Sequence, residues 1–193
     1  VSDALLARLA LPLPACAARK LLALDGLDEL WNRAAALAGS GFERLLAALD
    51  VEYVCDPSDL ALIPRSGPVI VMANHPHGFL DGMLLGSLLG QIRSDVKIIS
   101  NSLLSFSPEF SEHFIGVDVF ESPSALTANS KALREATRWL ESGGMLVVFP
   151  AGSVSRFRCS QWTVTDGPWS PHFAGLAKRV SARVIPMYIA GSN

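Results

Sequence analysis

The chain has 193 residues, half of them hydrophobic and only 18% charged, and its formal net charge at pH 7 is −2. This length favours one domain with a full hydrophobic core, and the absence of low-complexity segments argues against extended disorder. A slightly negative chain lacks the general electrostatic basis for binding nucleic acid, so we expect no such partner.

Three cysteines, Cys16, Cys55 and Cys159, are scattered along the chain and odd in number. They do not form a disulfide framework, and a reducing compartment fits them best. The apolar N-terminus resembles a signal peptide, and Cys16 lies in a short lipoprotein-like sequence. Because no basic segment precedes it, we expect neither secretion nor lipidation. No run reaches the ~18 apolar residues of a membrane-spanning helix.

Residues 1–50 are rich in Ala and Leu and are predicted to be helical, with Pro12 and Pro14 interrupting the first segment. Leu30 and Trp31 belong to a helical apolar pattern. We expect these helices to cover the core of the protein. The alternative is a helical layer that faces a membrane surface.

Strand-like and helix-like segments alternate in residues 51–193, which are predicted to form one domain. Its end three residues after a strand-like run is consistent with truncation at the C-terminus. The predicted strands are 69–73, 96–100, 116–120, 145–150 and 183–190. The predicted helices are 79–90, 125–141 and 172–182, and the second has an apolar stripe of Leu126, Leu133, Ala136 and Leu140. This alternation predicts an α/β fold, with a mostly parallel sheet flanked by helices.

The segment VIVMANHPHGFLDG, residues 69–82, carries the first candidate chemistry. In open α/β sheets, reactive groups gather where strands end and helices begin, and His75 follows the predicted strand. Pro76 keeps His75 out of the helical region, and Gly78 permits a tight turn. Asp81 then falls in the first turn of the next helix, where its carboxylate can reach the imidazole for general base catalysis. The alternative is that Asp81 only stabilises the helix N-terminus and the histidines are solvated.

This segment resembles the first motif of the glycerolipid acyltransferase family, which is Asn-His, four residues and Asp. Five residues separate His75 from Asp81 here, as is usual in the branch of hemolysin-related proteins and lyso-ornithine lipid acyltransferases. Three later segments resemble further motifs of that branch or family in the same order: FPAGSVSR (149–156), DGPWSP (166–171) and VIPMY (184–188). The resemblance covers about residues 50–193.

The resemblance implies transfer of a fatty acyl group from a thioester of acyl carrier protein or CoA to a lysolipid hydroxyl, such as that of lyso-ornithine lipid or a lysophospholipid. His75 is then the base and Asp81 supports it, with no metal and no cofactor beyond the acyl donor. A peripheral position at the cytoplasmic face of a membrane is expected, with attachment through apolar helices rather than charge. Substrate-binding roles are implied for Asn74, Pro76, His77, Gly78, Asn101, Ala151, Gly152, Ser153 and Arg156.

The sequence departs from the family pattern at several of these positions. Ser153 stands where the branch often has Glu, and Asn101 stands where many relatives have Lys, with loop hydrogen bonding or pocket lining as its role. The second family motif usually brings an Arg, but residues 114–120 offer Asp118 instead. A zwitterionic or amino-acid lipid is therefore favoured over lysophosphatidate as acceptor. His77 is not usual at its place, and we expect it to face solvent.

Other classes of function stay open at this point. His75, His77 and Asp81 could be metal ligands of a hydrolase, completed by His113, His172 or Asp166. A non-enzymatic lipid-binding module would fit the apolar composition and the helical N-terminus. Without the resemblance, Arg156 and Arg158 could equally form a solvated basic loop. No G-x-S-x-G segment is present, so a serine hydrolase is not expected.

Overall fold

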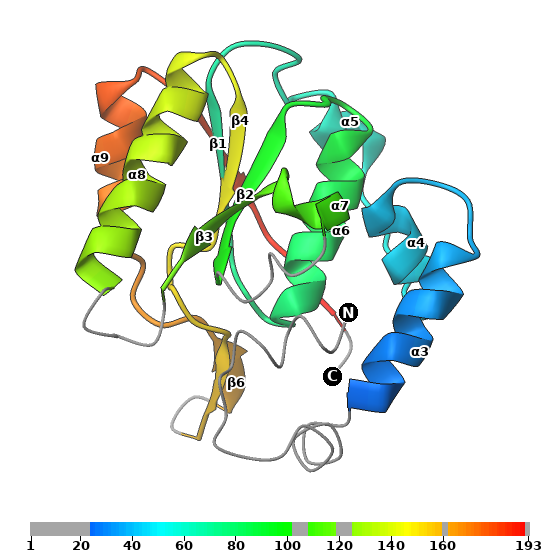
Figure 1. Ribbon diagram of the computed structural model, residues 1–193. Coiled ribbons are helices and arrows are strands. Elements are labelled where there is room, and N and C mark those ends of the chain that lie inside the picture. Colours follow the sequence, from blue (N-terminus) through cyan, green and yellow to red (C-terminus); the bar gives the residue numbers. More distant parts are fainter. Residues whose placement is uncertain (1–23, 102–107, 119–124, 160–161, 192–193) are drawn as a thin grey trace.

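The computed structural model describes residues 24–101, 108–118, 125–159 and 162–191. A five-stranded sheet forms its centre, with the strand order β3-β2-β4-β1-β7 (Figure 1). The strands are β1 Val69–Ala73, β2 Val96–Asn101, β3 Phe114–Val117, β4 Met145–Val148 and β7 Arg183–Met187. Every neighbouring pair is parallel, which confirms the predicted α/β fold.

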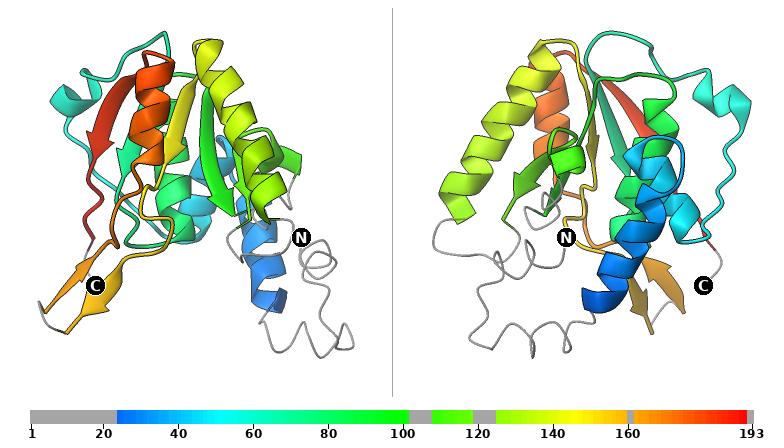
Figure 2. Two further views of the ribbon diagram at one scale, coloured as in Figure 1. Left: turned by 90° about the vertical axis from the view of Figure 1, so that its left-hand side faces the viewer. Right: turned by 45° about the vertical axis from the view of Figure 1, so that its right-hand side comes forward.

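Helices cover both faces of this sheet (Figures 1 and 2). One face carries α8 Ala125–Glu141 and α9 His172–Arg179, and the other carries α6 Phe79–Gly90. Outside α6 lie α3 Leu24–Ala35 and α4 Gly41–Ala48, and two short helices, α5 Pro57–Leu60 and α7 Pro108–Ser111, complete the set. Among the described helices, none combines the length and the hydropathy needed to cross a bilayer.

Side chains of the central strands alternate between two hydrophobic clusters. Val71 and Val147 pack toward α4 and α6, whereas Ile70 and Leu146 pack toward α8 and α9, and all four are fully buried. Both faces of the sheet are covered, and this is why these strands are continuous apolar runs rather than alternating ones.

The N-terminal helices complete one of these clusters. A capping box between Ser40 and Glu43 starts α4, and Phe42 then lies against α6. A Cβ on Gly86 would come within 2.8 Å of the Phe42 ring, so glycine allows the two helices to approach closely. The predicted helical cover is thus present over residues 24–48, while Pro12 and Pro14 lie outside the described residues.

Several predicted strands have different bounds in the structure. The third strand begins at Phe114 rather than at residue 116, because Phe114 and Ile115 are buried on opposite faces of the sheet. It ends at Val117, after which the Asp118 backbone pairs with the Asn129 side chain. The strand at 145–150 ends at residue 148, and the last strand ends at Met187.

The two C-terminal helices also differ from the prediction in detail. The buried face of α8 runs through Ala132, Ala136 and Leu140, spaced four residues apart. Leu133 is 44% exposed, so the predicted stripe was wrong at that residue. The last helix ends at Arg179 rather than at residue 182, and Ser181 then has a positive φ of 53°.

The short helices α5 and α7 were not predicted, and neither was a separate hairpin. The segments β5 Arg156–Arg158 and β6 Thr163–Thr165 form an antiparallel hairpin that is separate from the main sheet. It extends away from the body of the protein at the end where the sheet strands finish (Figures 1 and 2). Arg156 and Arg158, for which a solvated basic loop was the alternative, are exposed as that alternative requires but belong to a short strand.

Candidate active site

The candidate site lies where β1 and β4 end. These strands are neighbours and run in parallel, so the loops that follow them meet at the carboxyl edge of the sheet. The chain after β1 enters α6 on one face, whereas the chain after β4 leads to α9 on the other face. Open α/β proteins commonly place their chemistry at the carboxyl edge of the sheet where neighbouring strands lead to opposite faces.

His75 and Asp81 form a hydrogen-bonded pair at this edge of the sheet. His75 Nδ1 lies 2.9 Å from Asp81 Oδ2. With its Nδ1 proton donated to the carboxylate, the ring keeps the Nε2 lone pair as its acceptor. The His75 side chain is 19% exposed and the Asp81 side chain 1%, so the imidazole is reachable while the carboxylate is covered.

Aromatic and backbone groups hold the pair in place. The His75 ring stacks on Phe149 with centroids 4.1 Å apart and an angle of 22° between the planes. The His77 backbone N–H donates to the same Asp81 oxygen at 2.9 Å. Asp81 Oδ1 is buried and has no hydrogen-bond partner among the described residues.

Gly78 makes the turn between the pair possible. It precedes the first residue of α6 and has φ 64° and ψ −123°, a backbone conformation that residues with a Cβ rarely adopt. A Cβ there would also lie 3.3 Å from Val154, which belongs to the loop after β4. Gly78 therefore sets both the direction of α6 and the packing of the two site loops.

Asp166 joins the loops around His75. One of its oxygens accepts the His75 backbone N–H at 3.1 Å and the Ser155 hydroxyl at 2.5 Å. The other accepts the Trp169 indole N–H at 2.8 Å, and the Ser155 backbone N–H donates to the His75 carbonyl at 2.8 Å. Sequence reasoning missed this arrangement and gave Asp166 only as an alternative metal ligand. The sequence feature that indicates the contact between Asp166 and Trp169 is their three-residue spacing in DGPWSP.

Asn74, another predicted site residue on the loop after β1, contacts the chain that follows β7. Its side-chain NH₂ donates to the Ile189 carbonyl at 2.8 Å, and its oxygen accepts the Ile189 backbone N–H at 2.6 Å. Both polar atoms of Asn74 thus join the end of β1 to the chain that follows β7. This contact gives Asn74 a positioning role, and its substrate-binding role stays a prediction.

The remaining residues with predicted substrate-binding roles lie at the same edge of the sheet. The His77 ring, expected to face solvent, is half-buried, and a Cβ on Gly191 would collide with its Nε2 atom. Gly152 lies in a turn with φ 67°, and its N–H donates to the Phe149 carbonyl at 3.0 Å. The positions of the others are as follows: Pro76 and Ala151 are half-buried, Ser153 and Arg156 are exposed, and Asn101 is the last residue of β2.

The ligand set of the alternative metal-dependent hydrolase is not assembled in the described part of the chain. No group of three or more His, Cys, Asp or Glu side chains in these residues is placed to hold an ion. His113 instead lies beside Phe42, with ring centroids 5.2 Å apart, and His172 begins α9.

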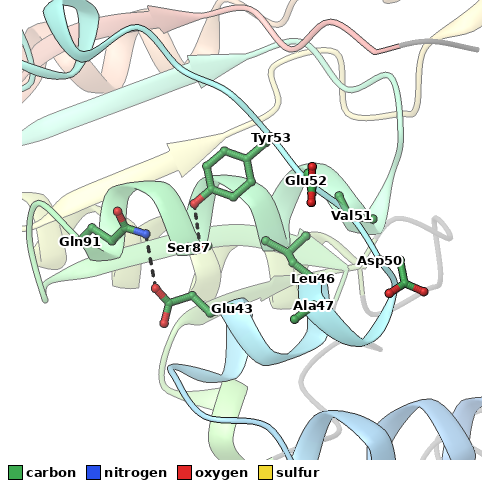
Figure 3. A pocket seen from close by; sticks show the side chains of 9 residues that line it. All are labelled: Glu43, Leu46, Ala47, Asp50, Val51, Glu52, Tyr53, Ser87 and Gln91. Carbon is green, nitrogen blue, oxygen red and sulfur yellow. Dashed lines mark hydrogen bonds between the residues drawn. The ribbon is translucent and has the colours of Figure 1, made fainter.

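A pocket of about 420 Å³ lies elsewhere, between α4 and α6 (Figure 3). Glu43, Asp50 and Glu52 line it together with Tyr53, whose hydroxyl is 3.0 Å from Ser87 Oγ. Neither His75 nor Asp81 contributes to its walls, so this acidic pocket is separate from the candidate site.

Known proteins resemble most of this chain. Two lyso-glycine lipid O-acyltransferases align with it: that of Bacteroides thetaiotaomicron is 24% identical over 91% of this chain, and that of Phocaeicola vulgatus is 26% identical over 68%. The alignments cover 62% and 45% of those two proteins, so this chain spans less than two thirds of the length of either relative. The family model for acyltransferases matches residues 45–193. The predicted resemblance is thereby confirmed at the level of the family: the chain belongs to the acyltransferase family.

Proposed function

We propose that this domain transfers a fatty acyl group from a thioester donor to the hydroxyl of a lysolipid. The observation that carries the proposal is the hydrogen bond between His75 Nδ1 and the buried Asp81 carboxylate. A carboxylate in this position orients the imidazole and stabilises its charged form, which makes Nε2 an effective base.

The proposed reaction needs only these groups and the two substrates. His75 Nε2 removes the proton of the acceptor hydroxyl as its oxygen attacks the thioester carbonyl. The tetrahedral intermediate then collapses, the new ester forms, and the leaving thiolate takes the proton from the imidazolium. Backbone N–H groups of the turn after β4 are candidates to stabilise the oxyanion. No metal or organic cofactor takes part in this scheme.

The acceptor that we favour is a lysolipid with an amino-acid headgroup. Both named relatives act on a lyso-glycine lipid, and the segment 114–120 has no arginine for a phosphate. Arg156, with Arg158 on the same strand, supplies positive charge for an anionic headgroup. Lyso-ornithine lipid and lysophospholipids remain further acceptors to test, with acyl carrier protein or CoA carrying the donor. We propose that the reaction takes place at the cytoplasmic face of a membrane, with the protein bound peripherally.

A mass-spectrometric assay tests this function. The wild type and a His75→Ala variant, purified in the same way, are offered acyl-CoA and acyl carrier protein thioesters with lyso-glycine, lyso-ornithine and glycerophospholipid acceptors. We expect a new acylated lipid with the wild type only. Equal product from a folded His75→Ala protein would contradict the mechanism. No product with any donor or acceptor from the folded wild type would contradict the proposed activity of this domain.

A further inference from the structure

The β5–β6 hairpin has one apolar and one cationic face. Phe157 and Val164 are direct cross-strand partners, so their side chains share a face. The Trp162 ring joins them, with its centroid 6.0 Å from that of Phe157. On the opposite face, Arg156 and Arg158 pair with threonines of β6.

The apolar face is open to solvent. Trp162 is 84% exposed, Phe157 54% and Val164 38%. A two-stranded hairpin is marginally stable by itself, and leaving three large apolar side chains in water adds nothing to its stability. Exposed apolar patches of this kind mark surfaces that bind a partner.

Exposed aromatic side chains are concentrated at this edge of the molecule. In the part of the chain that the structure describes, the exposed large aromatic residues are Phe157, Trp162, Trp169 and Tyr188. Phe157 and Trp162 belong to the hairpin, Trp169 donates to Asp166, and Tyr188 directly follows β7. Tryptophan and tyrosine with nearby arginine are typical of protein surfaces at the membrane–water interface.

The charge of the hairpin differs from that of the whole chain. Residues 154–165 contain two arginines and no acidic residue, whereas the chain has a net charge of −2. The hairpin is therefore complementary to anionic lipid headgroups, although the protein as a whole is not.

The hairpin is also tied directly to the candidate site. Ser155, immediately before β5, donates its backbone N–H to the His75 carbonyl, and Asp166, immediately after β6, accepts the His75 N–H. Val154 lies next to Gly78. A surface bound by the hairpin would thus lie at the loops that carry His75.

We propose that the β5–β6 hairpin docks the protein on an anionic lipid bilayer and so brings the acceptor lipid to His75. The partner follows from exposed Phe and Trp side chains beside two arginines, and its link to catalysis rests on the function proposed above. An acidic carrier protein is the competing partner. The bilayer is favoured because Phe157 and Trp162 are exposed and belong to a hairpin that projects from the body of the protein (Figure 2).

Sedimentation with phospholipid vesicles tests the docking surface without requiring turnover. The vesicles are phosphatidylcholine with or without a minority of phosphatidylglycerol. We expect a Phe157→Ser, Trp162→Ser double variant to lose about tenfold or more in partition onto the anionic vesicles, because two apolar anchors are removed. An Arg156→Gln, Arg158→Gln variant should lose its preference for anionic vesicles by about fivefold for each arginine.

Leu62→Ser is the matched control. Leu62 is 73% exposed and lies just beyond the end of α5. In Figure 1, α5 lies at the opposite end of the sheet from the hairpin. The loss of Leu62 should leave vesicle binding unchanged. If the aromatic double variant binds the anionic vesicles as well as the wild type does, the proposal is overturned. A wild type that binds neither vesicle but binds acyl carrier protein through the hairpin would also overturn it.

Turnover then separates this proposal from the proposed function. With a lyso-glycine lipid as the probe, the aromatic double variant should lose activity toward acceptor embedded in vesicles but keep it toward a short-chain, monomeric acceptor. Equal loss toward both acceptors would overturn the docking role. If the wild type binds vesicles through the hairpin but transfers no acyl group to either acceptor, the docking surface stands and the proposed function fails.

Discussion

Gly78 is the single residue whose backbone conformation most directly shapes the candidate site. Replacing it with alanine forces a Cβ into φ 64° and ψ −123° and against Val154 at 3.3 Å. We expect Gly78→Ala to lower the free energy of unfolding by about 1–3 kcal/mol and to displace Asp81 relative to His75. Urea unfolding measures the first effect.

Gly82 provides the matched control for this change. It lies in the first turn of α6, beside Asp81, and a Cβ there would meet nothing within 4 Å. Gly82→Ala should leave stability unchanged or raise it by up to about 1 kcal/mol, since alanine favours helix. If the two variants unfold at the same urea concentration, the strain assigned to position 78 is not real.

The residues of the β1 loop could be predicted because they are close in sequence. His75 and Asp81 are six positions apart, and a strand, a turn and a helix N-terminus bring them together by local geometry alone. Phe149 and Asp166 contact His75 from more than seventy positions along the chain. Their contacts depend on β1 and β4 being neighbours, and strand order is not encoded in any local pattern.

At the scale of elements, Asp166 links three segments: the loop after β1, the start of β5 and the start of the chain leading to α9. Asp166→Ala removes acceptors for the His75 N–H, the Ser155 hydroxyl and the Trp169 indole. Hydrogen bonds to a charged acceptor contribute roughly 1.5–3 kcal/mol each. We therefore expect local opening of these loops and faster exchange of the His75 amide.

Hydrogen exchange followed by mass spectrometry measures this opening. Peptides that cover β1 and its loop should exchange faster in Asp166→Ala, while peptides from α8 should not change. Ser153→Ala, in the exposed turn after β4, is the control and should behave as the wild type. Unchanged exchange around His75 in Asp166→Ala would show that Asp166 does not hold the loops together.

The buried helices and strands could be predicted from the sequence better than the exposed ones. The sheet strands and α6 are long apolar runs because both of their sides are covered, and these were placed within a few residues. The β5–β6 hairpin was missed because its strands have three residues each and are exposed, so no burial pattern marks them. Leu133 was misplaced because the buried face of α8 follows Ala132, Ala136 and Leu140 at intervals of four residues. Leu133 lies one position beside that row.

At the scale of the whole molecule, Arg93 joins the loops at the amino edge of the sheet. Its guanidinium donates to both Asp95 oxygens, at 2.6 and 2.7 Å, and to the carbonyls of Pro64, Gly67 and Gly143. The hydrogen bonds from Arg93 lower the pKa of the Asp95 carboxyl below its usual value. The Arg93 side chain is 2% exposed and that of Asp95 is 39% exposed.

This pair predicts a dependence of stability on pH. The folded pKa of Asp95 lies below the unfolded value of about 3.9, so its contribution is complete well above that pH and is lost as the pH falls through the folded pKa. We expect Asp95→Asn to reduce the free energy of unfolding at pH 7 by about 1 kcal/mol, a value reduced for solvent screening. Urea unfolding at a series of pH values should show this difference shrinking below pH ~4.

Glu141→Gln, at the exposed end of α8, controls for the loss of a surface carboxylate. It should change stability little at any pH. If the free energies of unfolding of Asp95→Asn and the wild type differ by the same amount at every pH, the pH dependence assigned to Arg93 and Asp95 is contradicted.

The most direct test of the proposed catalytic pair is a double-mutant comparison of acyl-transfer rates at His75 and Asp81. If Asp81 acts in catalysis only through His75, His75→Ala and Asp81→Asn should each lower kcat/KM by about 10²–10⁴-fold in folded protein. The double variant should then be no slower than His75→Ala alone, because the two residues work as one unit. Losses that multiply in the double variant, or a folded His75→Ala protein with the wild-type rate, would contradict the proposed catalytic pair.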